Sequence, residues 1–137
     1  MNHYLESRAA IVTALKAAIG EIPLYTENKP APAGGEYIQF WYDPASRSAA
    51  TLGEGGQDEL TGFAQIDVAY ESAGGFKRPL ELLGIVESAF NLSRQLTYGS
   101  TTVNITGLDV SPARNDDSNR FIRSVTVYYR YRKSRVV

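Results

Sequence analysis

The sequence contains no cysteine among its 137 residues and only one histidine, His3. Without thiols the chain can form no disulfide, no thiolate nucleophile and no cysteine-ligated zinc site. Because His3 lies at the very start of the sequence, it is a poor candidate for the base of a serine–histidine–acid arrangement. These absences exclude several common kinds of catalytic site.

Long apolar runs are also missing from the sequence. No stretch approaches the roughly 18 residues that a membrane-spanning helix requires. The first residues, MNHYLESRAAIV, lack the basic and apolar segments of a signal peptide. With 43% hydrophobic and 21% charged residues, the composition is that of a globular protein. We therefore expect one domain over residues 1–137, with no membrane partner, in the cytoplasm of the producing cell.

The charge of the chain is small in total but uneven along it. The net charge is −1, yet residues 1–110 hold 13 acidic and 7 basic side chains, whereas residues 111–137 hold 2 acidic and 7 basic ones. A basic segment of this kind can bind nucleic acid, or an acidic protein surface that includes a second copy of the chain. A charged strand that is simply solvated is an equally good explanation.

The stretch Glu59–Phe90 carries the clearest structural signal. Its first part alternates between apolar and polar residues, which is typical of a half-buried strand. The apolar residues that share one face of this strand are Ala64, Ile66, Val68 and Tyr70. Gly74 and Gly75 predict a turn, and an amphipathic helix follows it. The predicted apolar stripe of that helix consists of Phe76, Leu80, Leu83, Val86 and Phe90.

The remaining segments predict a second helix and further strands. A helix is expected over Tyr4–Ile19, with Asn2 as its N-cap and Gly20 at its C-terminal end. Its apolar face is predicted to contain Leu5, Ala9, Val12, Leu15 and Ile19. Strands are expected at Ile22–Tyr25 (on an edge), Tyr37–Tyr42 (closed by Asp43-Pro44), Gln95–Thr97 (short) and Thr102–Leu108.

A long final strand ends the sequence. Its predicted apolar face holds Phe121, Val125, Val127, Tyr129 and Tyr131, and its polar face holds Ser124, Thr126, Tyr128, Arg130 and Arg132. Arg123 interrupts the apolar face, which predicts a bulge or a strand end there. Taken together, the segments predict an α+β fold: a mainly antiparallel sheet with two helices packed on one face, in the order α-β-β-β-α-β-β.

Residues 45–58, ASRSAATLGEGGQD, are the least regular part of the sequence. Small residues and three glycines offer little apolar surface to bury, so we predict a long exposed excursion between two strands. Long irregular loops within a domain are usually functional or disordered. This segment is therefore a candidate for contact with a partner.

Candidate catalytic groups are few. Carboxylates gather at Glu54, Asp58 and Glu59, and again at Asp116 and Asp117. Such groups can hydrolyse glycosides or hold Mg²⁺, but here they fall in segments predicted to be exposed, where nothing shifts a pKa. We expect no enzyme activity, no catalytic residue, no metal and no cofactor. A deep pocket lined by a partly buried acid such as Asp67 or Glu71 would contradict this expectation.

Four segments together suggest a family. They are the helix YLESRAAIVTAL, the aromatic strand EYIQFWYDPAS, the unit GFAQIDVAYESAGGFKRPLELLGIVESAF and the closing strand RFIRSVTVYYRYR. In order and texture, the span Tyr4–Arg132 resembles the tail-terminator-like proteins of tailed bacteriophages. The resemblance implies a small α+β subunit that assembles into a ring, commonly a hexamer, on the head-proximal end of the tail tube. It further implies that the ring stops tube polymerisation and presents a surface to head-completion proteins, in the host cytoplasm during assembly and then in the virion.

The uneven charge suggests where such a subunit meets its neighbours, because a ring joins two different surfaces of the same chain. On one side we expect Arg47, Leu52, Asp58 and Glu59, near a neighbouring copy or the tail-tube protein. On the complementary side we expect Arg130, Arg132, Lys133 and Arg135. For these arginines, solubility or protection of a sheet edge is an equally good explanation.

Two other functions stay open at this point. Another head–tail connector or minor tail component would share the same helix-and-sheet design. A nucleic-acid-binding module using the basic final strand is the third possibility, although no sequence-specific recognition is expected. Salt-dependent binding of DNA would favour that module over an assembly protein.

Overall fold

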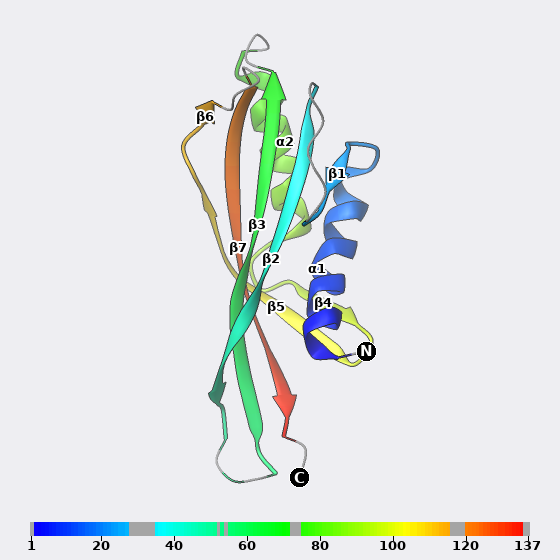
Figure 1. Cartoon of the computed structure of the whole chain (residues 1–137), viewed down its shortest axis with the longest axis vertical. Coiled ribbons are helices and arrows are strands. Elements are labelled where there is room, and N and C mark those ends of the chain that lie inside the picture. The colour runs from blue at the N-terminus through cyan, green and yellow to red at the C-terminus, as the bar shows by residue number, and fades with distance from the viewer. Residues whose placement is uncertain are drawn as a thin grey trace.

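The computed structural model describes residues 2–27, 35–51, 53, 55–71, 75–115 and 120–135. Two helices and seven strands occur within these residues (Figure 1). In chain order they are α1 (His3–Ile19), β1 (Leu24–Tyr25), β2 (Tyr37–Ala49), β3 (Gln57–Glu71), α2 (Lys77–Ala89), β4 (Gln95–Tyr98), β5 (Thr101–Val110), β6 (Arg114–Asn115) and β7 (Arg120–Ser134). Neither helix is long and apolar enough to cross a membrane.

The strands form one twisted sheet in the order β1-β2-β3-β7-β5-β4, and β6 pairs with the edge of β7 near its start. All described pairings are antiparallel except β1 with β2, where Leu24 and Tyr25 run parallel to Ile38 and Gln39. The sheet is therefore mixed, and the prediction of an α+β fold is correct in its class. The predicted order has one strand between the second helix and the last strand, and the structure has three. The short strand expected at Gln95–Thr97 is present as β4, whereas β6, with two residues, is too brief to show a period of two and is not predicted.

The hydrophobic core lies between the sheet and the two helices, which Figure 1 shows on one side of the sheet. From β3 it receives Ala64, Ile66, Val68 and Tyr70, as the alternation predicts. The predicted apolar face of β7 is also confirmed, with Val125, Val127, Tyr129 and Tyr131 buried. Each fully buried aliphatic or aromatic side chain of this kind contributes about 1.5–3 kcal/mol to folding.

Helix α1 begins and ends where the sequence predicts. The Asn2 side chain accepts a hydrogen bond from the backbone N–H of Leu5 at 2.9 Å, and Gly20 ends the helix with a φ of 61°. The predicted apolar face is right at its C-terminal end, where Leu15 and Ile19 are buried, but wrong at its start. Leu5 is 53% exposed. Its place in the interior is taken by two polar residues, Glu6 and Ser7.

Glu6 and Ser7 are buried because they tie α1 to the sheet. The Glu6 carboxylate accepts hydrogen bonds from the Ser100 backbone N–H (3.0 Å), the Ser100 hydroxyl (3.1 Å) and the Thr101 hydroxyl (3.1 Å). The Ser7 and Tyr42 hydroxyls are 2.7 Å apart. A buried polar group that finds such partners avoids the cost of desolvation. The helix is thereby fixed to the β4–β5 turn and to β2.

The predicted excursion at residues 45–58 is wrong at both ends, because β2 and β3 run 13 and 15 residues and continue into it. The pairing shifts register between Asp43 and Ser46 and then resumes, from Ser46 opposite Thr61 to Ala49 opposite Asp58. Proline has no N–H to donate and is tolerated at a bulge, so Pro44 bends the strand without ending it. Only residues 50–56 lie between the two strands.

The bulge or strand end predicted at Arg123 is also wrong. The pairing of β3 with β7 is unbroken from Gln57 opposite Ser134 to Glu71 opposite Arg120. The irregularity lies on the other side of β7, where β5 shifts register between Ile105 and Gly107.

The predicted stripe of the second helix is only half correct. Val86 and Phe90 are fully buried, and Leu83 is partly buried against the core. Phe76 and Leu80, on the same stripe, are 79% and 56% exposed. The period of a helix shows which residues share a face but not how far a neighbouring sheet covers that face.

Replacing Glu6 by Gln tests the tie between α1 and the β4–β5 turn. The pKa of the Glu6 carboxyl lies below its ordinary value of 4.5, chiefly because the Ser100 backbone N–H donates to the ionised form. A lowered pKa in the folded state adds stability that is complete above pH 4.5 and is lost as the pH falls through the folded-state value. In urea denaturation we expect wild type to be more stable than Glu6→Gln at neutral pH, with the difference shrinking as the pH falls below 4.5. A difference independent of pH would contradict this role.

Candidate functional site: the β arm

The far ends of three strands continue past the start of α1 and form a protrusion that we call the β arm (Figure 1). It consists of Ser46–Ala49 of β2, Gln57–Thr61 of β3 and Arg130–Ser134 of β7. All but one of the residues predicted as an interface lie in the β arm or directly after it, at Arg135. The exception, Leu52, lies outside the described residues.

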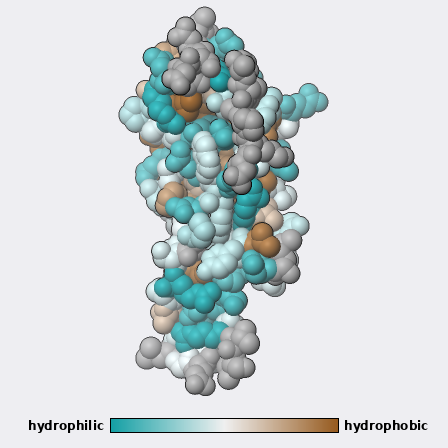
Figure 2. All heavy atoms as spheres, in the orientation of Figure 1, coloured by the Kyte–Doolittle hydropathy of each residue, from teal (hydrophilic) through white to brown (hydrophobic). Residues whose placement is uncertain are grey.

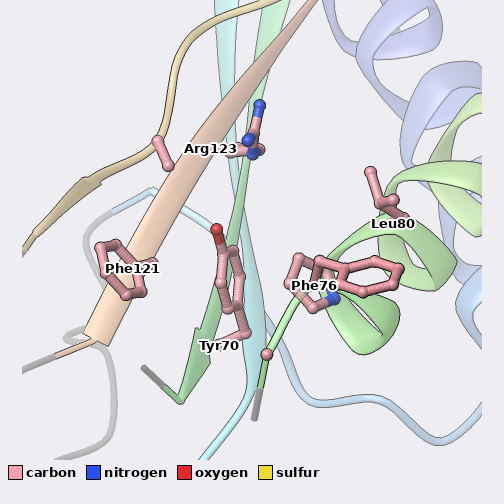
Figure 3. A pocket seen from close by; sticks show the side chains of 8 residues that line it. Tyr70, Phe76, Leu80, Phe121 and Arg123 are labelled. Carbon is pink, nitrogen blue, oxygen red and sulfur yellow. The ribbon is translucent and has the colours of Figure 1, made fainter. Parts of the chain in front are cut away.

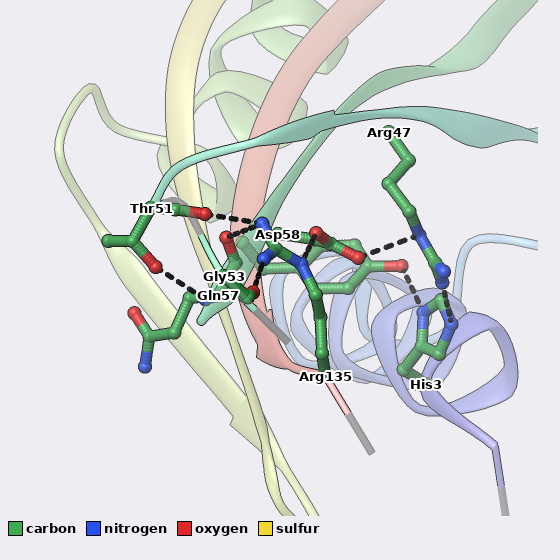
Figure 4. A network of polar contacts seen from close by, with 8 residues as sticks. His3, Arg47, Thr51, Gly53, Gln57, Asp58 and Arg135 are labelled. Carbon is green, nitrogen blue, oxygen red and sulfur yellow. Dashed lines mark hydrogen bonds and ion pairs between the residues drawn. The ribbon is translucent and has the colours of Figure 1, made fainter. Parts of the chain in front are cut away.

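On the face that looks toward the helices, three charged residues form one cluster (Figure 4). The Asp58 carboxylate is 2.7 Å from Nε of Arg135 and 3.6 Å from Nε of Arg47. The Arg135 guanidinium also donates to the backbone carbonyls of Thr51, Gly53 and Gln57. Arg135 follows β7, and these carbonyls belong to the β2–β3 connection and to the first residue of β3, so Arg135 links the end of β7 to the tip of the β2–β3 hairpin.

His3 joins this cluster from the start of α1. Its Nδ1 is 2.8 Å from the Tyr131 hydroxyl, and its Nε2 is 3.1 Å from Nη2 of Arg47. An arginine can only donate, so Nε2 accepts and the ring proton lies on Nδ1, which donates to Tyr131. Burial lowers the pKa of His3, and the positive charges of Lys133 and Arg47 lower it further. Burial also raises the pKa of Tyr131 to about 12.

The opposite face of the β arm has a second, looser pair. Arg130 and Glu59 approach to 3.6 Å, and both are partly exposed. Arg132 stands opposite Glu59 in the strand register on this face, whereas Lys133 stands opposite Asp58 on the face that looks toward the helices. The two groups of charges that the sequence suggested for opposite sides of a contact therefore lie beside each other in one chain. Whether they also meet another subunit stays a prediction.

The β arm and Arg135, which follows it, carry more positive than negative charge even when these ion pairs are taken into account. Arg47, Arg130, Arg132, Lys133 and Arg135 stand against only Asp58 and Glu59. Figure 2 shows strongly hydrophilic residues gathered over this end of the molecule. A surface with excess positive charge favours an acidic partner and speeds its association.

Sequence reasoning missed His3, Thr51, Gly53 and Gln57 as members of this network. The contacts of His3 reach residues 44 and 128 positions away, and no local pattern reports such pairs. The only available signal was the register of β3 with β7, which becomes visible once both strands are known to be long.

The acidic residues considered for catalysis are placed as follows. Glu54, Asp116 and Asp117 lie outside the described residues. Asp67 is buried and accepts hydrogen bonds from Ser124 (2.6 Å), Gln65 (3.0 Å) and Arg114 (3.2 Å). Since Arg114 belongs to β6, Asp67 holds that strand against the sheet. No three histidine or acidic side chains within the described ranges are grouped as a metal site requires.

The basic β arm is a surface suited to contact with an acidic macromolecule. A family model described as phage tail terminator protein matches residues 6–129, which is most of the chain. The chain belongs to the phage tail terminator protein family, and the resemblance seen in the sequence is confirmed. It is therefore a structural protein of a phage tail and a component of the virion.

Two solved structures share the fold. One is a protein chain whose name states no function, with a TM-score of 0.69 and 21% identity over 91% of this chain and 92% of that one. The other is a chain in the virion of a native gene transfer agent particle, with a TM-score of 0.55 and 19% identity over 98% of this chain and 99% of that one. A search of curated proteins found no match.

Replacing Asp58 by Asn tests the cluster of the β arm. The change removes the charge that two arginines share at a carboxylate only 13% exposed. We expect the free energy of unfolding to fall by about 1–3 kcal/mol and amide hydrogen exchange to accelerate in the β arm. Glu59→Gln is the matched control on the exposed face, where losing one ion pair costs less than about 1 kcal/mol. Equal effects of the two substitutions would argue against the cluster.

Titration of His3 tests its assigned proton arrangement. In the folded protein the neutral ring is favoured, so its stabilisation is complete above pH 6.5 and is lost as the pH falls through the lowered pKa. NMR titration of the ring should give a pKa below 6.5, and Arg47→Ala should raise it. A wild-type value at or above 6.5, or no response to Arg47→Ala, would show that the ring does not accept from Arg47.

Proposed function

We propose that this protein ends the tail tube by assembling into a ring, of six copies as the family resemblance implies, at the head-proximal end of the tail. The β arm is the contact with the tail-tube protein or the neighbouring subunit, and the opposite end of the molecule receives a head-completion protein. The observation that carries the proposal is the basic β arm, which extends past the start of α1 in a member of the tail terminator family.

The β arm suits this role because ion pairs hold its strands in one arrangement and because it is positively charged. Asp58, Arg47 and Arg135 tie its three strands together, so little order has to be gained on binding. Arg132 and Lys133 take part in no ion pair among the described residues, which leaves them for a partner. The fitting partner surface is acidic.

The sheet supports ring closure. A closed ring of identical subunits needs two different surfaces of one chain to meet. Among the described strands, β2 has no outer neighbour beyond Gln39, and β4 has none on its outer side. An open sheet edge is a surface to which another chain can add. One chain therefore offers two distinct edges for such a contact.

Charge reversal at Arg132 and Lys133 tests the β arm. In the phage that encodes this protein, deletion of its gene should give overlong or irregular tails detached from heads. A copy carrying Arg132→Glu and Lys133→Glu should fail to restore normal tails, because its charges repel an acidic partner. A copy carrying Lys16→Glu and Ala17→Glu, on the exposed side of α1, should restore them. Tail lengths are measured by electron microscopy.

Three outcomes would oppose the proposal. Normal tail length after deletion of the gene would remove tail termination as the function. Tails of normal length that lack heads would favour a different head–tail connector. Salt-dependent binding of DNA by the purified protein, lost in the Arg132→Glu and Lys133→Glu variant, would instead support a nucleic-acid-binding module.

A further inference from the structure

A charged residue occupies a core-facing position near the start of β7. Phe121, Arg123 and Val125 alternate on the side of the sheet that faces the helices, and Arg123 stands opposite Val68 of β3. The Nε atom of Arg123 is buried and has no hydrogen-bond partner within the part of the chain that the structure describes. Buried donors in folded proteins nearly always have an acceptor, so an orphaned one calls for an explanation.

Arg123 lines a cavity of about 440 Å³ between the start of α2 and the sheet (Figure 3). The other lining residues are mostly apolar, and they are Tyr70, Gly75, Phe76, Pro79, Leu80, Ala113 and Phe121. The rings of Tyr70 and Phe121 stack with their centroids 5.8 Å apart and form one wall. A largely apolar cavity with one polar group is typical of a site that binds an apolar ligand in a fixed orientation.

The cavity lies beside the first turns of α2, where one side of the helix is left uncovered although Pro79 and Leu82 on the neighbouring side are buried. Phe90 and Val86 are fully buried, whereas Leu80 and Phe76 on the same stripe are exposed. Phe76 is the most exposed of the large apolar side chains in the described residues. Exposed apolar residues that gather around a cavity are typical of a surface that another protein covers.

The unpaired Nε–H of Arg123 indicates which polar group the ligand carries in addition to an apolar side chain. An arginine pairs most strongly with a carboxylate. The described carboxylates at this end of the sheet already have partners: Glu36 pairs with Arg78 at 2.6 Å, Asp67 accepts from Ser124 and Arg114, and Glu71 accepts from the Gly35 backbone N–H at 3.2 Å. A carboxylate supplied from outside would therefore satisfy the Arg123 guanidinium.

We propose that this cavity binds a peptide segment of another virion protein, in which a side chain of the size of leucine or phenylalanine stands next to a carboxylate. The apolar side chain lies between Phe76, Leu80 and the Tyr70–Phe121 stack, and the carboxylate accepts from Arg123. The cavity lies at the opposite end of β3 from the β arm, roughly 40 Å away at the rise of an extended strand. The two surfaces therefore contact different partners, and this one does not depend on what the β arm binds.

Binding can be measured with two acetylated and amidated tetrapeptides that differ in a single group. One has the sequence glycine-leucine-aspartate-glycine, and the other has asparagine in place of the aspartate. In NMR titrations we expect the aspartate peptide to shift the amide signals of Phe76 and Leu80 and the Nε–H signal of Arg123. Its affinity should exceed that of the asparagine peptide by about tenfold or more, the usual effect of a hydrogen bond to a charged group.

Two variants test the carboxylate contact and the apolar contact of the site separately. Arg123→Met should remove the preference for aspartate while retaining the cavity, and Leu80→Asp should weaken both peptides. Leu92→Asp is the matched control, because Leu92 is 63% exposed and lies outside the cavity. Equal affinity of the two peptides, or no shift at the cavity up to about 10 mM peptide, would overturn the proposal. Either result would leave the tail-length test of the β arm unaffected.

Discussion

The antiparallel pairing of β3 with β7 is the constraint on which the rest of the structure depends. It runs without a break from Gln57 opposite Ser134 to Glu71 opposite Arg120. Because side chains alternate along both strands, this register places Ile66 and Val125 together on the core side and Asp67 and Ser124 together on the other. A slip of one residue would reverse every one of these placements, so the apolar core fixes the register strongly.

The same pairing also creates the two candidate surfaces. At one end the strands continue past the start of α1, and the β arm is held by the Asp58 cluster and by His3 of α1. At the other end a cavity opens at Arg123, beside the first turns of α2. The core between them is covered by α1 and α2. Both surfaces therefore lie where the helices leave part of the sheet uncovered.

Local patterns in the sequence predicted much of the fold. The caps of α1 at Asn2 and Gly20, the buried face of β3 and the buried face of β7 follow from propensity and period alone. The parallel pairing of β1 did not, because two residues carry no information about direction. The continuation of β2 past Pro44 was missed because a proline usually ends a strand, and here a bulge accommodates it.

The candidate sites were less predictable than the fold. Charge counting drew attention to Arg47, Asp58 and the basic residues of β7, yet it treated them as two separate surfaces. Their proximity within one chain depends on long-range strand register, which a single sequence does not reveal. Arg123 was noticed as an interruption of an apolar face, and its meaning changes once the unbroken register excludes a bulge. An unexplained polar residue in a buried pattern is therefore informative about ligands as well as about backbone irregularity.

The central claim is that the β arm is an assembly surface at the head-proximal end of the tail. Electron cryomicroscopy of intact virions measures this most directly, because it locates each copy relative to the tail tube. The account predicts a ring of this protein at that end, with residues 46–49 and 130–134 of each copy buried against the tube protein or the adjacent copy. Copies placed elsewhere in the tail, or β arms that project free into solvent, would contradict it.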